Sequence, residues 1–245
     1  MRRADQYLWR SLLLLLLLLT LALGCATQLG KRAPNAAASP APSASPTPQK
    51  PSDTIDRATS EPYTGTLSQF EDPKREEKLQ PNRIMDVLGI KAGSGVADIG
   101  AGSGWFTVRA ARRAGNDGTV YAVDINSEYL KYIDDRAKRE NLPNIRTILG
   151  KPDDPLLPKN SVDAVLLLKT YHEVAQPILL LKHAREAMRP GALLGIIDRN
   201  GDPDSHGIDK TVVIEEAGRA GFALVAEHDF VKPDNVDYFL VFRVR

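Results

Sequence analysis

The chain has 245 residues, and its 32 lysines and arginines nearly balance its 31 aspartates and glutamates, for a net charge of +1 at pH 7. Aromatic residues make up only 6% and are not interleaved with basic runs, so no face that would hold a nucleic-acid backbone is expected. After the N-terminal segments, about 180 residues remain, which is enough for one well-buried domain and too few for two.

The N-terminus carries the pattern of an export signal. A basic start at Arg2 and Arg3 precedes an almost pure leucine core from Leu12 to Leu23. A transmembrane helix needs about 20 apolar residues, so this core has the length of a signal-peptide core and is short for a membrane span. Residues 21–25 read L-A-L-G-C and end at Cys25. This is the only cysteine of the chain, so no intramolecular disulfide can form.

This ending resembles a bacterial lipoprotein box, in which the cysteine is lipidated and becomes the mature N-terminus. The resemblance implies a signal peptide over residues 1–25, lipidation of Cys25, and a membrane-anchored domain on the extracytoplasmic side, in the periplasm or at the cell surface. An uncleaved signal anchor, or an ordinary signal peptide with an incidental cysteine, remains the alternative. Residues 26–62 are rich in Ala, Pro, Ser and Thr, which predicts a disordered linker.

Residues 63–245 are expected to form one α/β domain. Helices are predicted over residues 71–79, 81–89, 105–113, 128–140, 178–188 and 210–220, and strands over 96–99, 119–124, 144–149, 161–168, 192–198, 222–230 and 237–243. Alternating strands and helices predict a doubly wound, mostly parallel sheet of seven strands. The last two strands are expected to pair as an antiparallel hairpin at one edge. Ligands of such sheets bind beyond the carboxyl ends of the strands.

The most informative stretch is V-A-D-I-G-A-G-S-G-W-F-T over residues 96–107, a short apolar strand followed by a turn with Gly100, Gly102 and Gly104 at every second position. Glycines there let the backbone approach a ligand without a Cβ in the way. The helix that follows offers unpaired N–H groups to a ligand over the turn. The stretch therefore predicts a ligand-binding loop.

A dinucleotide is the first candidate for this loop, but two residues speak against it. The fingerprint G-x-G-x-x-G would place its third glycine where Trp105 stands. Asp98, at the mouth of the turn, would repel a pyrophosphate. A carboxylate suits a ligand with a positive end, such as a sulfonium beside an ammonium group, so S-adenosylmethionine is favoured over NAD.

The same stretch closely resembles motif I of class I S-adenosylmethionine-dependent methyltransferases. The resemblance continues through residues 120–125 (V-Y-A-V-D-I), 161–168 (S-V-D-A-V-L-L-L) and 188–194 (M-R-P-G-A-L-L), in the order and spacing of that family, and covers roughly residues 70–245. It implies a Rossmann-like methyltransferase fold, S-adenosylmethionine as cofactor, and methyl transfer to an unidentified small molecule.

The resemblance also implies a set of cofactor-binding residues. The glycines would form a backbone wall against the methionine part, and Asp98 would set the charge near the sulfonium and ammonium groups. Asp124, at the end of the second strand, would accept hydrogen bonds from both ribose hydroxyls. Relatives carry an adenine-binding acid where Lys151 stands here, so Asp153 or Asp154 is expected to take that role, with a solvated acidic loop as the alternative.

Residues 169–173 (K-T-Y-H-E) follow the fourth strand, where the family places the transferring methyl group. His172 is the candidate general base, since histidine titrates near neutrality; capping of the following helix is its alternative role. His206 is a weaker candidate in a loop that often covers the substrate. Tyr63 and Phe70 could belong to an N-terminal cover, and no metal site is expected.

Three classes of function stay open at this point. A methyltransferase requires cofactor binding that depends on Asp98 and Asp124. A binding lipoprotein that reuses the fold would keep the pocket without methyl transfer, and an oxidoreductase would bind NAD. The export signal raises a difficulty for the enzyme, because S-adenosylmethionine is made in the cytoplasm. The oligomeric state is not indicated by the sequence.

Overall fold

A computed structural model describes residues 53–55, 57–60, 63–201, 205–231 and 236–245. The predicted signal peptide, Cys25 and the linker up to residue 52 lie outside the described residues. The described residues belong to one unit, Lys50–Arg245.

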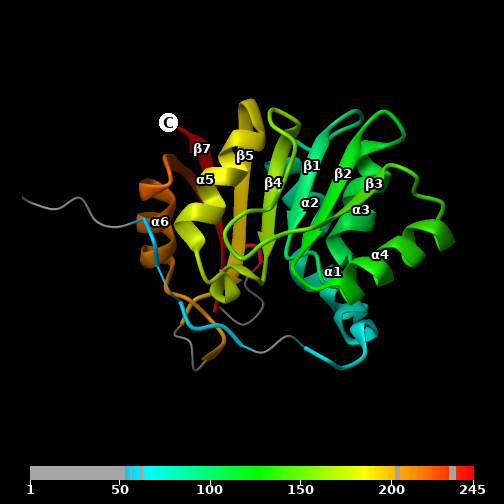
Figure 1. The fold of residues 1–245 in the computed structure, drawn as a ribbon, viewed down its shortest axis with the longest axis horizontal. Coiled ribbons are helices and arrows are strands. Elements are labelled where there is room, and N and C mark those ends of the chain that lie inside the picture. The colour runs from blue at the N-terminus through cyan, green and yellow to red at the C-terminus, as the bar shows by residue number, and fades with distance from the viewer. Residues whose placement is uncertain (1–52, 56, 61–62, 202–204, 232–235) are drawn as a thin grey trace, which may run out of the picture. The chain divides into compact units, whose positions relative to one another are not determined.

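Seven strands form one sheet in the order β3-β2-β1-β4-β5-β7-β6 (Figure 1). The first five pair in parallel, whereas β7 runs antiparallel to both β5 and β6. This arrangement confirms the predicted α/β fold with its antiparallel C-terminal edge. The strands are β1 (Gly95–Ile99), β2 (Thr119–Asp124), β3 (Ile145–Leu149), β4 (Val162–Leu168), β5 (Met188–Arg199), β6 (Phe222–His228) and β7 (Asp237–Val244).

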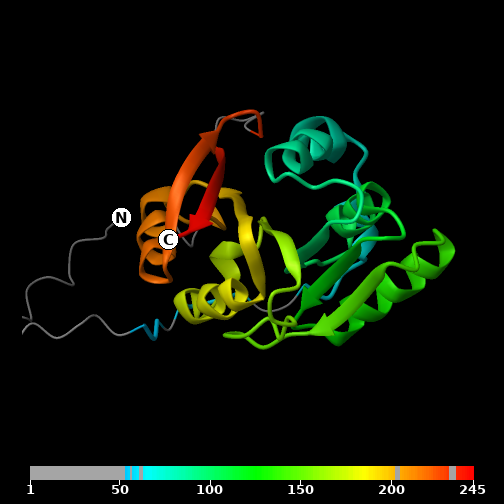
Figure 2. The same ribbon diagram turned by 90° about the horizontal axis from the view of Figure 1, so that it is seen from above.

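Helices pack on both faces of the sheet (Figure 2). Apolar side chains of α2, α3 and α4 join one buried cluster, and those of α5 and α6 join a second. In the described part of the chain, no helix combines the length and the apolarity needed to cross a bilayer. The helices are α1 (Lys74–Leu79), α2 (Pro81–Val87), α3 (Trp105–Ala114), α4 (Ser127–Arg139), α5 (Pro177–Ala187) and α6 (Lys210–Arg219), with 3-10 turns η1 (Leu67–Glu71) and η2 (Tyr171–Glu173).

The helix predicted over residues 71–79 differs in the structure. A 3-10 turn, η1, ends at Glu71, and α1 begins only at Lys74. Pro73 separates them because a proline at the start of a helix has no N–H to donate, and it restricts the residue before it to extended backbone. Asp72 takes that extended role, with a ψ of 122°.

The sheet brings the ends of β1, β2 and β4 side by side. Strand β1 lies between β2 and β4, with Ile99 opposite Val123 and Leu167. All five β1 residues are buried, as expected for a central strand covered on both faces. The loops that leave these three strands therefore start within one small region at the carboxyl edge of the sheet.

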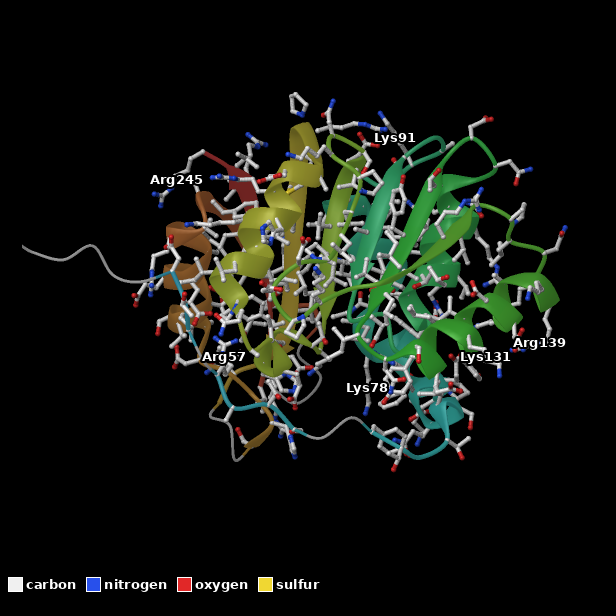
Figure 3. All side chains as sticks on the ribbon, viewed as in Figure 1. Arg57, Lys78, Lys91, Lys131, Arg139 and Arg245 are labelled. Atoms are coloured by element: carbon white, nitrogen blue, oxygen red, sulfur yellow. The ribbon has the colours of Figure 1, made fainter. Side chains whose placement is uncertain are left out.

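Residues at the end of the expected linker contact the domain. Arg57 donates two hydrogen bonds of 2.7 Å to the Glu216 carboxylate on α6 and one of 2.9 Å to the carbonyl of Tyr171. Asp53 pairs with Lys182 on α5, and the amide of Ile55 bonds to Gln176. Figure 3 labels Arg57 on this segment. Charged pairs and hydrogen bonds thus join the described residues 53–55 and 57–60 to the domain.

The Arg57–Glu216 pair should contribute measurably to stability. Glu216 is 5% exposed, and an Arg57→Ala variant would leave its carboxylate buried without its cation. Breaking a buried pair on one side costs about 3 kcal/mol or more, so we expect the free energy of unfolding to fall by about 3 kcal/mol. Urea denaturation followed by circular dichroism measures it.

Arg139→Ala, which removes an exposed arginine of α4, is the matched control and should change stability by less than about 0.5 kcal/mol. Equal stability of the Arg57→Ala and Arg139→Ala variants would show that the segment around Arg57 does not hold to the domain in solution.

Candidate functional site

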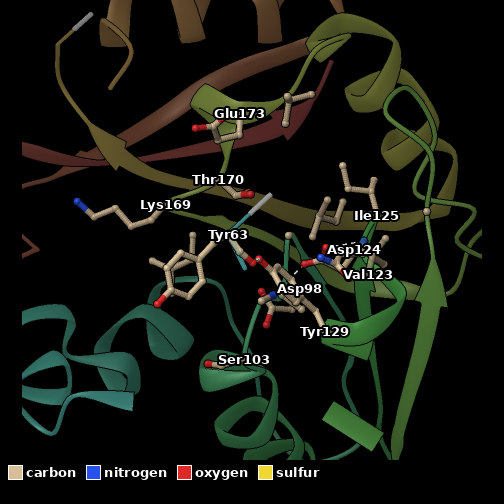
Figure 4. A pocket seen from close by; sticks show the side chains of 18 of the residues that line it. Tyr63, Asp98, Ser103, Val123, Asp124, Ile125, Tyr129, Lys169, Thr170 and Glu173 are labelled. Atoms are coloured by element: carbon tan, nitrogen blue, oxygen red, sulfur yellow. Dashed lines mark hydrogen bonds between the residues drawn. The ribbon is translucent and has the colours of Figure 1, made fainter. Parts of the chain in front are cut away.

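A cavity of about 800 Å³ opens at the carboxyl edge of the sheet (Figure 4). Its walls come from the loops after β1, β2, β3 and β4, from the N-terminal segment before α1, and from the loop after β5. Among its lining residues are Ser60, Tyr63, Phe70, Arg75, Asp98, Gly100, Gly102, Ser103, Asp124, Ile125, Tyr129, Lys151, Lys169, Thr170, His172, Glu173 and His206.

The glycine loop forms one wall of this cavity in a conformation that requires glycine. Gly100, Gly102 and Gly104 all have positive φ, at 74°, 55° and 72°. A Cβ on Gly100 would lie 2.2 Å from Oγ1 of Thr170, so even alanine would clash there. The loop after β1 and the loop after β4 therefore touch through a glycine, as the motif predicts.

Asp98 is a buried carboxylate at the cavity wall. It is 2% exposed, and its Oδ2 accepts a 2.6 Å hydrogen bond from the hydroxyl of Thr107. Burial raises the pKa of Asp98 to about 6, against the lowering effects of the Thr107 hydrogen bond and of the Arg75 cation. A buried acid with this pKa is poised to become a stable anion when a cation binds beside it.

Asp124 ends β2 and is bound to the glycine loop. Its Oδ2 accepts the amide of Gly102 at 2.9 Å, and its Oδ1 accepts the amide of Asn126 at 3.0 Å. Burial raises the pKa of Asp124, although these backbone hydrogen bonds act in the opposite direction. Each oxygen can accept a further hydrogen bond from a ligand in the cavity, so the carboxylate suits a vicinal diol.

Ile125 was missed in the sequence analysis. It is 59% exposed although it is large and apolar, and it lines the cavity next to Asp124. An exposed isoleucine beside this carboxylate offers an apolar surface to a flat ring of a bound ligand. The signal in the sequence was an isoleucine directly after the acid that ends a predicted strand.

The structure does not bring Asp153 and Asp154 to the described cavity wall. Gly150, Lys151 and Pro152 line the cavity in their place. Asp154 accepts the amide of Leu156 at 2.8 Å and so stabilises its own turn. The predicted adenine contact through either acid has no support from this geometry.

His172 lines the cavity from η2, the 3-10 turn that follows β4. Its Nδ1 is 2.8 Å from Oδ1 of Asp198, a fully buried residue of β5, and its amide donates to Oδ2 of the same carboxylate at 3.0 Å. Burial lowers the pKa of His172, but the hydrogen bond and charge of Asp198, with Glu173, outweigh it and raise the pKa overall. Because a carboxylate only accepts, Nδ1 carries the proton and Nε2 faces away from Asp198.

Glu173 and His206 lie beside this histidine. Oε1 of Glu173 is 3.6 Å from Nε2 of His172, and Oε2 accepts the amide of Ser60 at 2.6 Å. Burial raises the pKa of Glu173, but the Ser60 hydrogen bonds and the two histidines outweigh it and leave the pKa below its usual value. Ligand atoms of His172, Glu173 and His206 all lie within 4.8 Å of one another.

The N-terminal segment covers part of the cavity. Tyr63 and Phe70 both line it and contact each other edge to face, with ring centroids 5.3 Å apart. Arg75 of α1 stacks over Trp105 at 4.8 Å and lines the same wall as Asp98. Trp105 is 2% exposed, as expected for a packing residue. Arg75, which the sequence analysis did not single out, is a cation at the methionine end of the predicted site.

Known proteins share this set of loops. Residues 96–191 match a family model described as a methyltransferase domain. This segment resembles a methyltransferase domain. The match runs from β1 into β5, and so it includes the glycine loop, Asp98, Asp124 and His172.

Two relatives of this chain are described as methyltransferases. An uncharacterised methyltransferase of Mycobacterium bovis is 36% identical over 124 residues, which cover 51% of this chain and 47% of the relative. The same values hold for an uncharacterised methyltransferase of Mycobacterium tuberculosis. The chain thus spans about half the length of these curated relatives. The family match and the relatives support the resemblance to class I S-adenosylmethionine-dependent methyltransferases.

Solved structures with a similar fold agree with the topology. A SAM dependent methyltransferase from Aquifex aeolicus superposes with a TM-score of 0.67 at 24% identity, over 73% of this chain and 97% of that one. A [4+2]-cyclase superposes with a TM-score of 0.58 at 16% identity, over 68% and 80%. At these identities the likeness shows the fold of the chain and not its reaction.

The raised pKa of Asp98 makes a prediction about stability. A carboxyl group with a folded-state pKa above its unfolded value stabilises the protein at low pH, and this contribution is lost as pH rises through the folded pKa. With a folded pKa of about 6, the stability of the wild type relative to Asp98→Asn should fall by about 3 kcal/mol between about pH 3 and pH 7.

Urea denaturation of both proteins across this range gives the difference. Asp135→Asn, which neutralises an exposed carboxylate of α4, should keep a constant offset from the wild type. A constant offset for Asp98→Asn as well would mean that Asp98 is ionised throughout and that its pKa is not raised.

Proposed function

We propose that this protein transfers a methyl group from S-adenosylmethionine to a small-molecule acceptor. The single observation that carries the proposal is the joint position of Asp98 and Asp124 on the wall formed by the glycine loop. When bound, the cofactor supplies an activated methyl group on a sulfonium, so the protein has to hold and align the reactants. No step needs an external activator of the methyl group.

The proposed methionine end of the site combines both charges that an amino acid requires. Asp98 is the anion for the ammonium and sulfonium groups, and its burial makes the attraction strong. Arg75 is the cation for the carboxylate, since a guanidinium can bind both oxygens at once. Gly100, Ala101 and Gly102 of the glycine loop line the same cavity.

The proposed adenosine end lies along the loop after β2. Asp124 would hold the two ribose hydroxyls through its two oxygens, which the amides of Gly102 and Asn126 already fix in place. Ile125 would pack against the adenine ring. Because Asp153 and Asp154 are directed elsewhere, the backbone and side chains of residues 150–152 are the candidates for contact with the adenine edge.

The acceptor side of the cavity is assigned to η2. His172 would present the lone pair of Nε2 to the acceptor, with its ring orientation set by Asp198. The role of general base, predicted from the sequence, is compatible with this geometry. The cover formed by Tyr63 and Phe70 would exclude water from this side of the cavity.

The two alternatives are weaker on specific grounds. A binding protein that reuses the fold would keep the same pocket, and the cyclase with this architecture illustrates that a fold does not fix a reaction. This alternative gives no role to a histidine that a buried carboxylate orients toward the cavity. NAD is disfavoured because the carboxylate of Asp98 lies where a pyrophosphate would bind, and Trp105 occupies the third glycine position.

Calorimetric titration of S-adenosylmethionine tests the proposal. We expect micromolar binding by the wild type and a loss of about tenfold or more in Asp124→Asn, which replaces a charged acceptor by a neutral one. Asp135→Asn is the matched control and should bind as the wild type does. NAD should not bind.

The absence of S-adenosylmethionine binding by a folded wild-type protein would refute the methyltransferase proposal. Binding that the Asp124→Asn variant retains in full would refute the assignment of Asp124 to the ribose. Binding of NAD in preference would establish the oxidoreductase alternative.

We also propose that the domain is anchored to a membrane through a lipid on Cys25, on the extracytoplasmic side, as the lipoprotein-like box suggests. In a bacterial host, metabolic labelling with a fatty-acid analogue should label the wild type, and Cys25→Ser should abolish the labelling because no other thiol exists in the chain. Equal labelling of both proteins, or of neither, would contradict the anchor.

A further inference from the structure

The acceptor side of the cavity contains a cluster that methyl transfer alone does not require. His172 and Glu173 come from η2 after β4, and His206 comes from the loop after β5, 33 residues beyond Glu173. Their ligand atoms nevertheless lie within 4.8 Å of one another. We propose that His172, Glu173 and His206 bind one divalent transition-metal ion at the wall of the cavity.

The hydrogen bonds around the cluster orient its members as metal ligands. Metal-binding histidines commonly donate their second ring N–H to a carboxylate, which fixes the ring and the tautomer. Asp198 provides that carboxylate for His172, at 2.8 Å from Nδ1, and so leaves Nε2 as the ligand atom. The amide of Ser60 holds Oε2 of Glu173 and leaves Oε1 beside Nε2. Two of the three ligands are thus held in place before an ion binds.

The type of ligand selects the type of ion. Two imidazoles and one carboxylate suit Zn²⁺, Co²⁺ or Fe²⁺, whereas Mg²⁺ and Ca²⁺ prefer sites made of oxygen atoms alone. Ligand atoms around a tetrahedral ion at about 2.1 Å lie roughly 3.4 Å apart. The 3.6 Å between His172 and Glu173 is already close to this value. His206, which is exposed, can turn toward the ion to complete the set.

The charges around the cluster favour a cation. The carboxylates of Glu173 and Asp198 lie on either side of the His172 ring. Lys169 is the opposing positive charge on this wall, and its ammonium pairs with Asp237 of β7. A bound ion would use the lone pair of His172 Nε2, so the metal site would take the place of the general-base role of this histidine, and it would also account for the convergence of Glu173 and His206.

The site would be open toward the cavity. Three protein ligands leave at least one coordination position, and all three residues line the cavity. The open position would take a hydroxyl or carboxylate oxygen of the acceptor, a consequence that rests on the proposed methyl transfer. The binding of the ion does not rest on it, so metal titration and cofactor titration can fail independently.

Metal titration of the untagged full-length protein, dialysed first against a chelator, tests the site. We expect one Zn²⁺ per chain with micromolar or tighter affinity, and Co²⁺ to bind with visible absorption bands of a site with nitrogen and oxygen ligands. Glu173→Gln and His206→Ala should each weaken binding by about tenfold or more, since loss even of an outer hydrogen-bond partner costs 10–100-fold. Mg²⁺ should not compete.

His183→Ala is the matched control, because His183 lies on α5 and bonds to the carbonyl of Asp153, away from the cavity lining. It should bind Zn²⁺ as the wild type does. No stoichiometric binding by the wild type, or binding that both Glu173→Gln and His206→Ala retain in full, would overturn the metal site. The S-adenosylmethionine titration of the same protein separates that result from a failure of the proposed function.

Discussion

The parallel pairing of β2, β1, β4 and β5 is the constraint on which the rest of the site depends. Parallel strands all end at the same edge of a sheet, so each loop that leaves this edge contributes to one region. Asp98, Asp124, His172 and Asp198 are spread over about a hundred residues of sequence, yet each lies at or just beyond the end of a different one of these strands. The cavity is a consequence of the topology before any one side chain is considered.

Two kinds of carboxylate meet in this cavity, and burial affects them differently. Asp98 has one hydroxyl donor and almost no exposure, so its charge is unfavourable until a cation arrives. Asp124 receives two backbone amides, which support its charge in the absence of a ligand. The first arrangement suits electrostatic recognition of a positive group, and the second suits geometric recognition of hydroxyls.

The features that the sequence predicted well are those encoded within a short stretch. The alternation of apolar strands and amphipathic helices predicts the sheet, and the positive φ values of Gly100, Gly102 and Gly104 explain why their spacing was informative. Asp124 was found because it ends a recognisable strand.

What the sequence did not indicate depends on contacts between distant segments. His206 gains meaning only beside Glu173, and Arg57 only beside Glu216, which is 159 residues away. Asp153 and Asp154 follow the motif position in sequence, but neither is among the cavity-lining residues, and Asp154 bonds within its own turn.

The pairs that hold residues 53–60 also have a mechanical consequence. Asp53 and Arg57 are joined to α5 and α6, and both precede the cavity-lining residues Tyr63 and Phe70 along the chain. A pulling force applied to the chain ahead of Asp53 would pass into these two helices before it reached the aromatic cover. Arg57 also donates to the carbonyl of Tyr171 on η2, so part of that load would reach the cavity wall, and a domain held by its N-terminal end would feel tension at its site.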